Sequence, residues 1–392
     1  EFDHPEAHRK FVWDVAQSLW TKEFVHLFKK QEMEILSFYQ SLFESKLLSY
    51  GNLRKSVVHN DANSHNIIVS KDLLNPKVKA IIDFGDAIHT QIINDVAIGA
   101  AYEMMGSLNP LEAIAPFLKG YHESFPLEEK ELEFLYVAIA MRLTITVTKS
   151  AINKREEPDN KYLIISEKSA WDLLYKWYSI DKDFAHYTFR GVCGFTPHPK
   201  ENEFNVLIKR KKFKLINLFP TAGSNHVKLL DLSVGSTWCG HQEEMDDLDY
   251  FTYKIKKLQV KHPKLVICGG YLEPRSVYTT EAYDRIGNNG NESRTVHMGI
   301  DFWLPAGTPV HSLFDAEIVT AVHDVGNKEY GGLIILKHHE EGLEFFSLYG
   351  HLSFASVKGL RKGKKVKKGA CVGFLGNYPE NGNWSPHLHF QL

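Results

Sequence analysis

Five residues near the C-terminus have the types and spacing to hold a metal ion. They lie in three short stretches, with His297 and Asp301 in the first, His351 in the second, and His387 and His389 in the third. Residues two or four apart on a β-strand point to the same face, so each pair would present two polar groups to one side. Zinc accepts imidazole and carboxylate ligands, and a catalytic zinc has three protein ligands and a water molecule. The pattern therefore indicates a zinc hydrolase site with two histidines free for proton transfer.

The order of these motifs resembles that of a known family. It resembles that of the bacterial lysostaphin/LytM-like zinc endopeptidases, which cut short peptide bridges in cell walls. The motifs are, in this order, His297-x-Gly-x-Asp301, Tyr-Gly-His351-Leu and Pro-His387-Leu-His389-Phe. The resemblance implies that His297, Asp301 and His389 bind the zinc. It also implies that His351 and His387 take the proton from the attacking water and stabilise the oxyanion.

A second group of polar residues lies upstream and has the spacing of a kinase site. Four residues separate Asp61 from Asn66, and Asp83-Phe-Gly follows after another apolar stretch. In protein kinases the catalytic-loop Asp acts on the substrate hydroxyl, and the Asn and the Asp-Phe-Gly Asp hold magnesium. The spacing therefore predicts that Asp61 orients or deprotonates a hydroxyl, and that Asn66 and Asp83 bind Mg²⁺.

The wider sequence resembles the aminoglycoside phosphotransferase family, and most of all its hydroxylysine-kinase-like branch. The resemblance is carried by His59-x-Asp61-x-x-x-x-Asn66, by Ile-Asp83-Phe-Gly-Asp and by Asp95-Val-Ala. It implies an ATP-dependent phosphotransferase module that acts on an amino alcohol or a hydroxylysine-like substrate. It also implies that His59 braces the catalytic loop.

The lobe of such a kinase that covers ATP has no counterpart in the sequence before Asp61. The first hundred residues contain no glycine-rich loop and no strand lysine, and residues 6–48 have the periodicity of two amphipathic helices. The sequence also begins with Glu1-Phe2. We expect that the chain is a fragment of a longer protein and does not phosphorylate substrates without that lobe. Kinases of this type occur in bacterial fusions with a LytM-like domain and an aminotransferase, so a C-terminal aminotransferase domain is a further expectation.

The predicted fold class is multidomain α+β. Residues 1–190 form a mainly α-helical kinase-like C-lobe, residues 191–262 a linker and a β-rich accessory segment, and residues 263–392 an all-β LytM-like domain of the barrel-sandwich type. The apolar periodicity predicts helices over Asp95–Met105, Leu111–Phe125, Leu127–Lys149, Tyr162–Tyr178 and Asp246–Lys257. Alternating residues predict strands over Asn205–Ile208 and Phe213–Leu218, and a hairpin formed by Leu333–His339 and Leu343–Leu348.

Composition limits the classes of function. The 392 residues are 43% hydrophobic and 24% charged with a net charge of −2, which argues against a general nucleic-acid or membrane-surface protein. The four cysteines are far apart without a Cys-x-x-Cys motif, so neither a disulfide framework nor a zinc ribbon is indicated. No apolar run approaches the 18 residues that span a bilayer. A cytoplasmic location is expected.

Two segments near the metal motif have less specific patterns. Glu273, Arg275 and Tyr278 could line a substrate groove, although a packing role is at least as compatible with the pattern. The stretch Lys358–Lys368 contains seven basic residues, which indicates either a solvated loop or a patch for an anionic ligand.

Two functions follow from the sequence. The first is a zinc-dependent hydrolase for a peptide or small-molecule amide, joined to a phosphotransferase that uses ATP and Mg²⁺. The second is a non-catalytic LytM-like adaptor or ligand-binding domain in a multidomain enzyme of amino-alcohol metabolism, because a fold does not determine a function.

Overall fold

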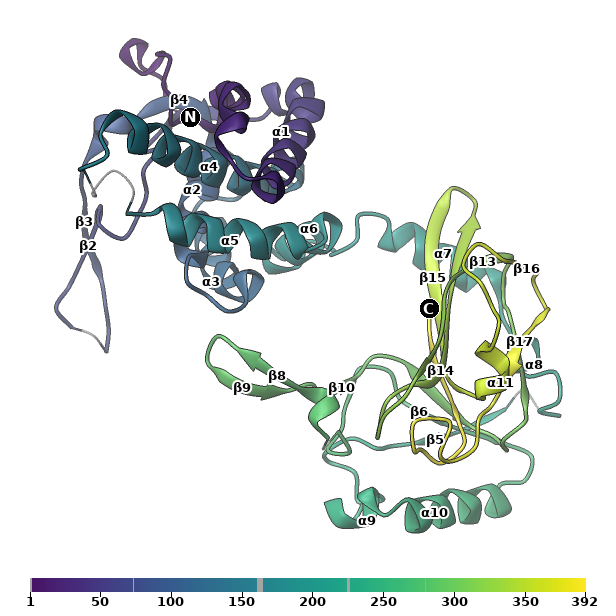
Figure 1. Ribbon diagram of the computed structural model, residues 1–392. Helices are drawn as coiled ribbons and strands as arrows, with labels where there is room; N and C mark the ends of the chain where they lie inside the picture. The colour runs from purple at the N-terminus through teal and green to yellow at the C-terminus, as the bar shows by residue number, and fades with distance from the viewer. Residues whose placement is uncertain (1, 73, 161–164, 224–225, 279) are drawn as a thin grey trace. The chain divides into compact units, whose positions relative to one another are not determined.

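The chain divides into two compact units. Unit 1 comprises residues 1–201 and 287–289, and unit 2 comprises residues 202–286 and 290–392. Figure 1 shows the elements of both units coloured along the chain. The computed structural model describes residues 2–72, 74–160, 165–223, 226–278 and 280–392.

Unit 1 is mainly helical, as the periodicity predicts. Its 3₁₀ helices are η1 (Pro5–Ala7), η2 (Val15–Leu27) and η3 (Phe84–Asp86), and its α-helices are α1 (Lys30–Gly51), α2 (Ile92–Met104), α3 (Pro110–Ser124), α4 (Glu129–Glu156), α5 (Glu167–Ser179) and α6 (Lys182–Val192). The predicted helices over residues 95–105, 111–125 and 127–149 correspond to α2, α3 and α4. The predicted helix over 162–178 corresponds to α5, and its first residues, 162–164, lie outside the described part of the chain.

Helix α4 forms the centre of unit 1. It begins with a capping box between Glu128 and Glu131 and carries basic residues in its last turn, which suits the helix dipole. By length and apolar composition alone, α4 could cross a membrane. The expectation that no segment of the chain is long and apolar enough to do so was therefore wrong. However, 83% of the most apolar 18-residue stretch of this helix is buried inside the protein, as in the core helix of a globular domain.

Short strands carry the upstream polar motif. Strand β1 (Lys55–Val58) pairs with β4 (Ile88–Gln91), and β2 (Ile67–Val69) pairs with β3 (Val78–Ile81). Both pairs are antiparallel, and Figure 1 shows β2 and β3 extending from the helices of their unit. The loop between β1 and β2 carries Asp61 and Asn66, and the turn after β3 carries Asp83.

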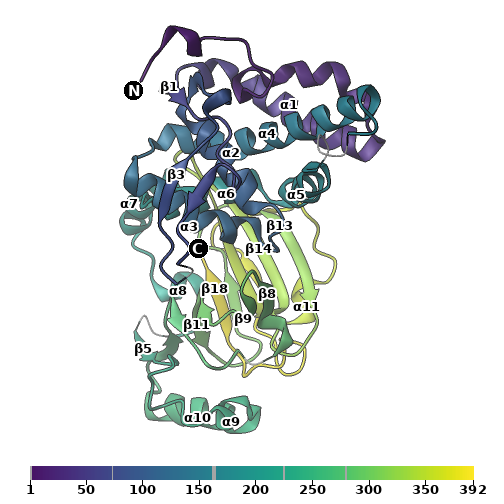
Figure 2. The ribbon, with the colours of Figure 1, turned by 90° about the vertical axis from the view of Figure 1, so that its left-hand side faces the viewer.

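Unit 2 is built on an eight-stranded sheet with the order β16-β13-β14-β15-β18-β11-β6-β5. Figure 2 shows several of these strands side by side. All neighbours are antiparallel except β5 and β6. The strands are β5 (Val227–Leu230), β6 (Val266–Gly269), β11 (Ile300–Trp303), β13 (Ala316–Asp324), β14 (Gly331–Glu340), β15 (Leu343–Leu352), β16 (Lys365–Val366) and β18 (Leu388–Gln391). The predicted hairpin is confirmed as β14 and β15.

Smaller elements surround this sheet. Among the described residues, antiparallel pairs are formed by β7 (Glu273–Pro274) with β10 (Val296–His297) and by β12 (Pro309–His311) with β17 (Cys371–Phe374), and β8 (Asp284–Gly287) pairs with β9 (Gly290–Ser293). The helices are α7 (Glu201–Lys211), α8 (Leu215–Leu218), α9 (Gln242–Asp246), α10 (Leu248–Lys261), η5 (Glu281–Tyr283) and α11 (Phe354–Val357). Apolar side chains from β12, β14, β15 and β17 share one core, which includes Val310, Leu336, Tyr349 and Val372.

The accessory segment differs from its prediction. Residues 205–208 and 213–218 were expected to be strands, but they lie in α7 and around α8. Phe204, Leu207 and Ile208 have the spacing of one helix face and pack together on the core of unit 2, and a window of four residues cannot distinguish this pattern from a strand. The expectation of a β-rich segment over 191–262 was therefore wrong, since β5 is its single strand among the described residues.

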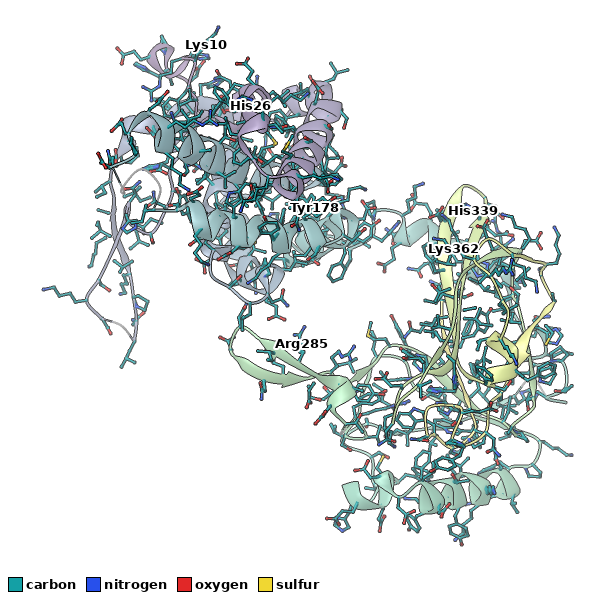
Figure 3. The ribbon with its side chains drawn as sticks, viewed as in Figure 1. Lys10, His26, Tyr178, Arg285, His339 and Lys362 are labelled. Carbon is teal, nitrogen blue, oxygen red and sulfur yellow. The ribbon has the colours of Figure 1, made fainter. Side chains whose placement is uncertain are left out.

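The basic stretch over residues 358–368 is a solvated loop that includes the short edge strand β16. Its lysine and arginine side chains are exposed, and Lys362 is labelled in Figure 3. Lys365 pairs with Glu317, and Lys367 Nζ lies 3.1 Å from Asp315 Oδ2. These local pairs supply anions to part of the stretch, which favours the loop over a ligand patch.

Candidate metal centre and phosphotransferase site

Strand pairing brings the three predicted metal ligands together. Asp301 on β11 lies directly opposite His389 on β18, and His297 is the last residue of β10. Gly299 lies between His297 and Asp301, and a Cβ atom at that position would lie 2.7 Å from the His389 ring. Only glycine therefore fits at position 299.

The three side chains converge on one point. His297 Nε2 lies 2.9 Å from His389 Nδ1, and both nitrogens lie 3.1 Å from Asp301 Oδ1. All three residues are buried. Two ligands of a tetrahedral zinc, each about 2.0 Å from the ion, are roughly 3.3 Å apart. The donor types and their separations thus fit a zinc ion.

Hydrogen bonds at the outer ring nitrogens select the ligand atoms. His297 Nδ1 donates to the carbonyl oxygen of Gly270 at 2.8 Å, which leaves Nε2 with a lone pair. His389 presents Nδ1 to the cluster, and its Nε2 lies 3.1 Å from the Gln391 side-chain amide, whose oxygen must face Nε2 for Nδ1 to be free of a proton. Such outer partners fix the tautomer and orientation of a ligating imidazole.

His351 and His387 lie beside the cluster as a second pair. Their ring centroids are 4.2 Å apart, and their Nδ1 atoms donate to the carbonyl oxygens of Asn381 and Ser385 at 2.9 and 2.8 Å. Each Nε2 therefore carries a lone pair, and His387 Nε2 lies 3.7 Å from Asp301 Oδ1. Burial lowers the pKa of both imidazoles, in His387 to about 4, so both are neutral near pH 7 and able to accept a proton.

Arg275 is held by two carboxylates. The sequence left open whether it lines a substrate groove or packs inside the domain, and in the structure Nη1 donates to Asp301 Oδ2 at 2.6 Å and Nε donates to Glu273 Oε2 at 2.7 Å. Burial by itself would raise the pKa of Asp301, yet Arg275 and His297 hold that pKa well below its usual range. Arg275 thus keeps Asp301 ionised and occupies Oδ2, which leaves Oδ1 facing the two imidazoles.

A cavity of about 270 Å³ opens onto these groups. All five histidine and aspartate residues of the C-terminal motifs line it. Of the three residues expected at a substrate groove, Arg275 and Tyr278 also line this cavity. A space of this size suits a small ligand or a short stretch of peptide better than a long polymer.

In unit 1 the loop after β1 holds Asp61 in a network of hydrogen bonds. Asp61 Oδ2 accepts from the side-chain amides of Asn63 and Asn66, each at 2.9 Å. Asp61 Oδ1 lies 3.2 Å from Nη2 of Arg142, a buried residue of α4. His59 Nε2 donates to the carbonyl oxygen of Ile82 at 2.9 Å and so ties the loop to the strand before Asp83, in the bracing role that the resemblance implies.

Asp83 stands apart from the other two predicted residues. No hydrogen bond joins its side chain to Asp61 or Asn66 among the described residues, and its backbone has a φ of 62° in the left-handed region. Burial raises the pKa of nearby Asp86, the carboxylates of Asp61 and Asp83 raise it further, and Arg142 and Arg9 lower it. The three acidic groups therefore lie close enough to influence one another, beside two arginines.

The sequence did not indicate several residues that complete the two sites. Asn381 and Ser385 act through backbone carbonyls, for which residue type carries no signal. Arg142 and Asp61 are 81 positions apart. A single arginine within the apolar face of α4 was nevertheless a usable signal, because a buried arginine needs an anionic partner.

Residues 295–392 match the sequence profile of Peptidase family M23. M23 is a family of metallopeptidases, which implies a metal ion at the cluster of His297, Asp301 and His389. The glycyl-glycine endopeptidase ALE-1 of Staphylococcus capitis is 36% identical over 106 residues, which are 27% of this chain and 26% of that protein. The crystallised catalytic domain of lysostaphin from Staphylococcus simulans is 33% identical, with 25% of this chain and 66% of that chain covered and a TM-score of 0.20.

Residues 3–134 match the profile of the phosphotransferase enzyme family. Mouse hydroxylysine kinase is 30% identical over 186 residues, which are 44% of this chain and 50% of the mouse protein. The chain thus spans about half the length of this relative. A region similar to hydroxylysine kinases is thus followed by a β-rich domain that matches the M23 peptidase profile, in the order that the motifs predicted. The aminotransferase domain stays a prediction.

Proposed function

We propose that unit 2 is a zinc-dependent hydrolase of peptide or other amide bonds, joined to an ATP-dependent phosphotransferase module that acts on an amino alcohol or a hydroxylysine-like substrate. The observation that carries the hydrolase is the convergence of three ligand atoms within about 3 Å of one another, beside two neutral histidines in one buried cavity. The named relatives of this domain include a glycyl-glycine endopeptidase, which supports an amide as the bond that is cleaved.

The chain's own residues have separate tasks in this proposal. His297, Asp301 and His389 would hold the zinc, which polarises an amide carbonyl and acidifies a water molecule when it is bound. His387 or His351 accepts the proton of the attacking water at its free Nε2. The resulting imidazolium then donates to the oxyanion or to the leaving amine. Arg275 holds Asp301 in place throughout.

The phosphotransferase proposal rests on the Asp61 network. Asp61 would receive the proton of a substrate hydroxyl, and the amides of Asn63 and Asn66 fix the direction of its carboxylate. Asn66 and Asp83 are the proposed ligands for Mg²⁺ with ATP. The relatives named hydroxylysine kinase support a small amino-alcohol substrate of this class.

The hydrolase is tested by incubating the zinc-loaded chain with two sets of small substrates and with intact cell walls. Pentaglycine represents the glycine-rich peptides, and small amides of amino alcohols represent a metabolic substrate. We expect slow or no cleavage of intact cell walls and measurable cleavage of the short amides, because the cavity is small. Full zinc occupancy with no hydrolysis of any amide would contradict the hydrolase and favour the adaptor function.

Arg275→Met is expected to weaken zinc binding by about 10- to 100-fold, as loss of an outer partner of a metal ligand typically does. The change frees Asp301 Oδ2 and leaves Glu273 without its cation. The measurement is competition for zinc with a fluorescent chelator. Arg294→Met removes an exposed arginine from the same cavity and is the matched control, with no expected change. Equal zinc affinity in Arg275→Met and the wild type would remove Arg275 from the metal centre.

A further inference from the structure

Lys328 lies in the wall of the cavity and is buried without an anion. The residue is 8% exposed, and no carboxylate oxygen lies within 4.0 Å of its Nζ in the described part of the chain. Nζ instead lies 4.0 Å from the centroid of the Trp384 ring. Burial of an ammonium group is unfavourable without an anionic partner, and a cation–π contact offsets only part of that cost.

The backbone holds this side chain in place. Lys328 has a φ of 66°, in the left-handed region that residues other than glycine adopt at a cost. Its N–H donates to the carbonyl oxygen of Gly382 at 2.9 Å, and its carbonyl oxygen accepts from the Tyr283 hydroxyl at 2.6 Å. Trp384 is fixed too, since its Nε1 donates to the carbonyl oxygen of Glu329 at 3.2 Å. The lysine and its aromatic partner therefore form a rigid unit.

This unit adjoins the two proton-accepting histidines. The Trp384 ring centroid lies 5.9 Å from the His351 ring and 6.1 Å from the His387 ring. A group bound at Lys328 would consequently lie one aromatic ring away from both imidazoles. Lys328 and Trp384 line both this cavity and a neighbouring one, so such a group would lie at the boundary between the two.

Three other charged residues of the cavity, Arg275, Asp301 and Asp324, have partners within the protein. Arg275 is bound to Glu273 and Asp301, and Asp324 Oδ2 accepts from the backbone of Tyr330. Asp246 is the carboxylate that raises the pKa of Lys328, but burial has the larger effect and lowers it. Lys328 thus has no carboxylate in direct contact with its ammonium group among the described residues, and an external anion can supply one.

We propose that Lys328 binds an anionic group, a carboxylate or a phosphate, on the substrate whose amide is cleaved at the adjoining metal centre. The inference rests on the proposed hydrolase function and names its substrate class, which is a small anionic amide. A peptide with a free C-terminal carboxylate and the amide of a phosphorylated amino alcohol both belong to this class.

The first experiment measures anion binding separately from hydrolysis. Metal-free full-length chain is titrated by calorimetry at constant ionic strength with inorganic phosphate and, in a second arm, with N-acetylglycine. We expect Lys328→Met to weaken binding of at least one anion by about tenfold or more, the effect of a lost charge-assisted hydrogen bond. Lys328→Arg keeps the positive charge and should retain most of the binding. The arm that responds identifies the anion.

Lys254 offers a matched control on the same domain. Its Nζ lies 4.4 Å from the centroid of Trp238, so it makes the same kind of contact without lining the cavity. Lys254→Met should bind both anions as the wild type does. Zinc content and circular dichroism of each variant establish that the domain is folded.

The second experiment compares tetraglycine with its C-terminal amide as substrates of the zinc-loaded chain. We expect kcat/KM to favour the free carboxylate by about tenfold through KM, and the preference to disappear in Lys328→Met. Anion binding that is equal in Lys328→Met and the wild type overturns the proposal. Anion binding that depends on Lys328 without cleavage of either peptide supports the anion site and contradicts the hydrolase instead.

Discussion

Replacing His389 with alanine is expected to abolish stoichiometric zinc binding and all amide hydrolysis. Its Nδ1 is one of only three ligand atoms in the cluster, 2.9 Å from His297 Nε2 and 3.1 Å from Asp301 Oδ1. The loss in affinity should exceed the roughly 100-fold that removal of an outer partner causes. Elemental analysis of the purified variant and competition with a chelator measure it. The wild type should hold about one zinc per molecule.

His387→Gln is the control for this result. His387 lies two residues before His389, just ahead of β18, and its Nε2 is 3.7 Å from Asp301 Oδ1. We therefore expect the variant to keep zinc and to lose hydrolysis, because only the proton acceptor is gone. If both variants lost zinc equally, the roles that we give to the two histidines would be wrong.

The second large effect is expected in unit 1, for Asp61→Ala. Arg142 is 4% exposed, and removal of the carboxylate leaves its guanidinium buried without an anion. Loss of one partner of such a pair costs about 3 kcal/mol, and the amides of Asn63 and Asn66 also lose an acceptor. Hydrogen exchange of residues 59–66 and of α4 should rise. In a chain to which the ATP-covering lobe has been restored, phosphorylation of an amino alcohol should be lost with it.

The double variant Asp61→Ala with Arg142→Met separates the ion pair from the loop. Since neither charge is then left buried alone, the double variant should be more stable than Asp61→Ala. With the ATP-covering lobe restored, phosphorylation should be absent in both variants. Equal exchange rates in Asp61→Ala and the wild type would show that Arg142 does not depend on Asp61.

Local patterns in the sequence predicted the elements with long, regular periodicity. Helices α2 to α4 repeat their apolar residues every three or four positions, and strands β14 and β15 repeat them every second position. Each pattern continues for ten or more positions, so it fits only one type of secondary structure. Helix α7 was missed because a short alternating run also fits a helix. The parallel pairing of β5 with β6 depends on contacts between residues about 40 positions apart, which no local pattern records.

The same distinction applies to the sites. His297, Asp301 and His389 are residues that bind metal ions, and the order of their motifs is specific enough to indicate a metal centre. The structure brings the three side chains together. The partner of Arg275 could not be predicted, since Asp301 lies 26 positions away and Glu273 is an equally suitable anion. Lys328 is one of many lysines, and only its burial distinguishes it.

The position of β18 has a consequence for the order of folding. Residues 388–391 lie in the middle of the sheet, and β18 is the strand that joins β15 to β11. On the ribosome, the two groups of strands that flank it are synthesised earlier, and each keeps an unpaired edge until this segment emerges. The contact between Asp301 and His389 closes a loop of 88 positions, which is slow relative to local structure. A nascent chain would therefore bring the three proposed metal ligands together only after its synthesis had passed this strand.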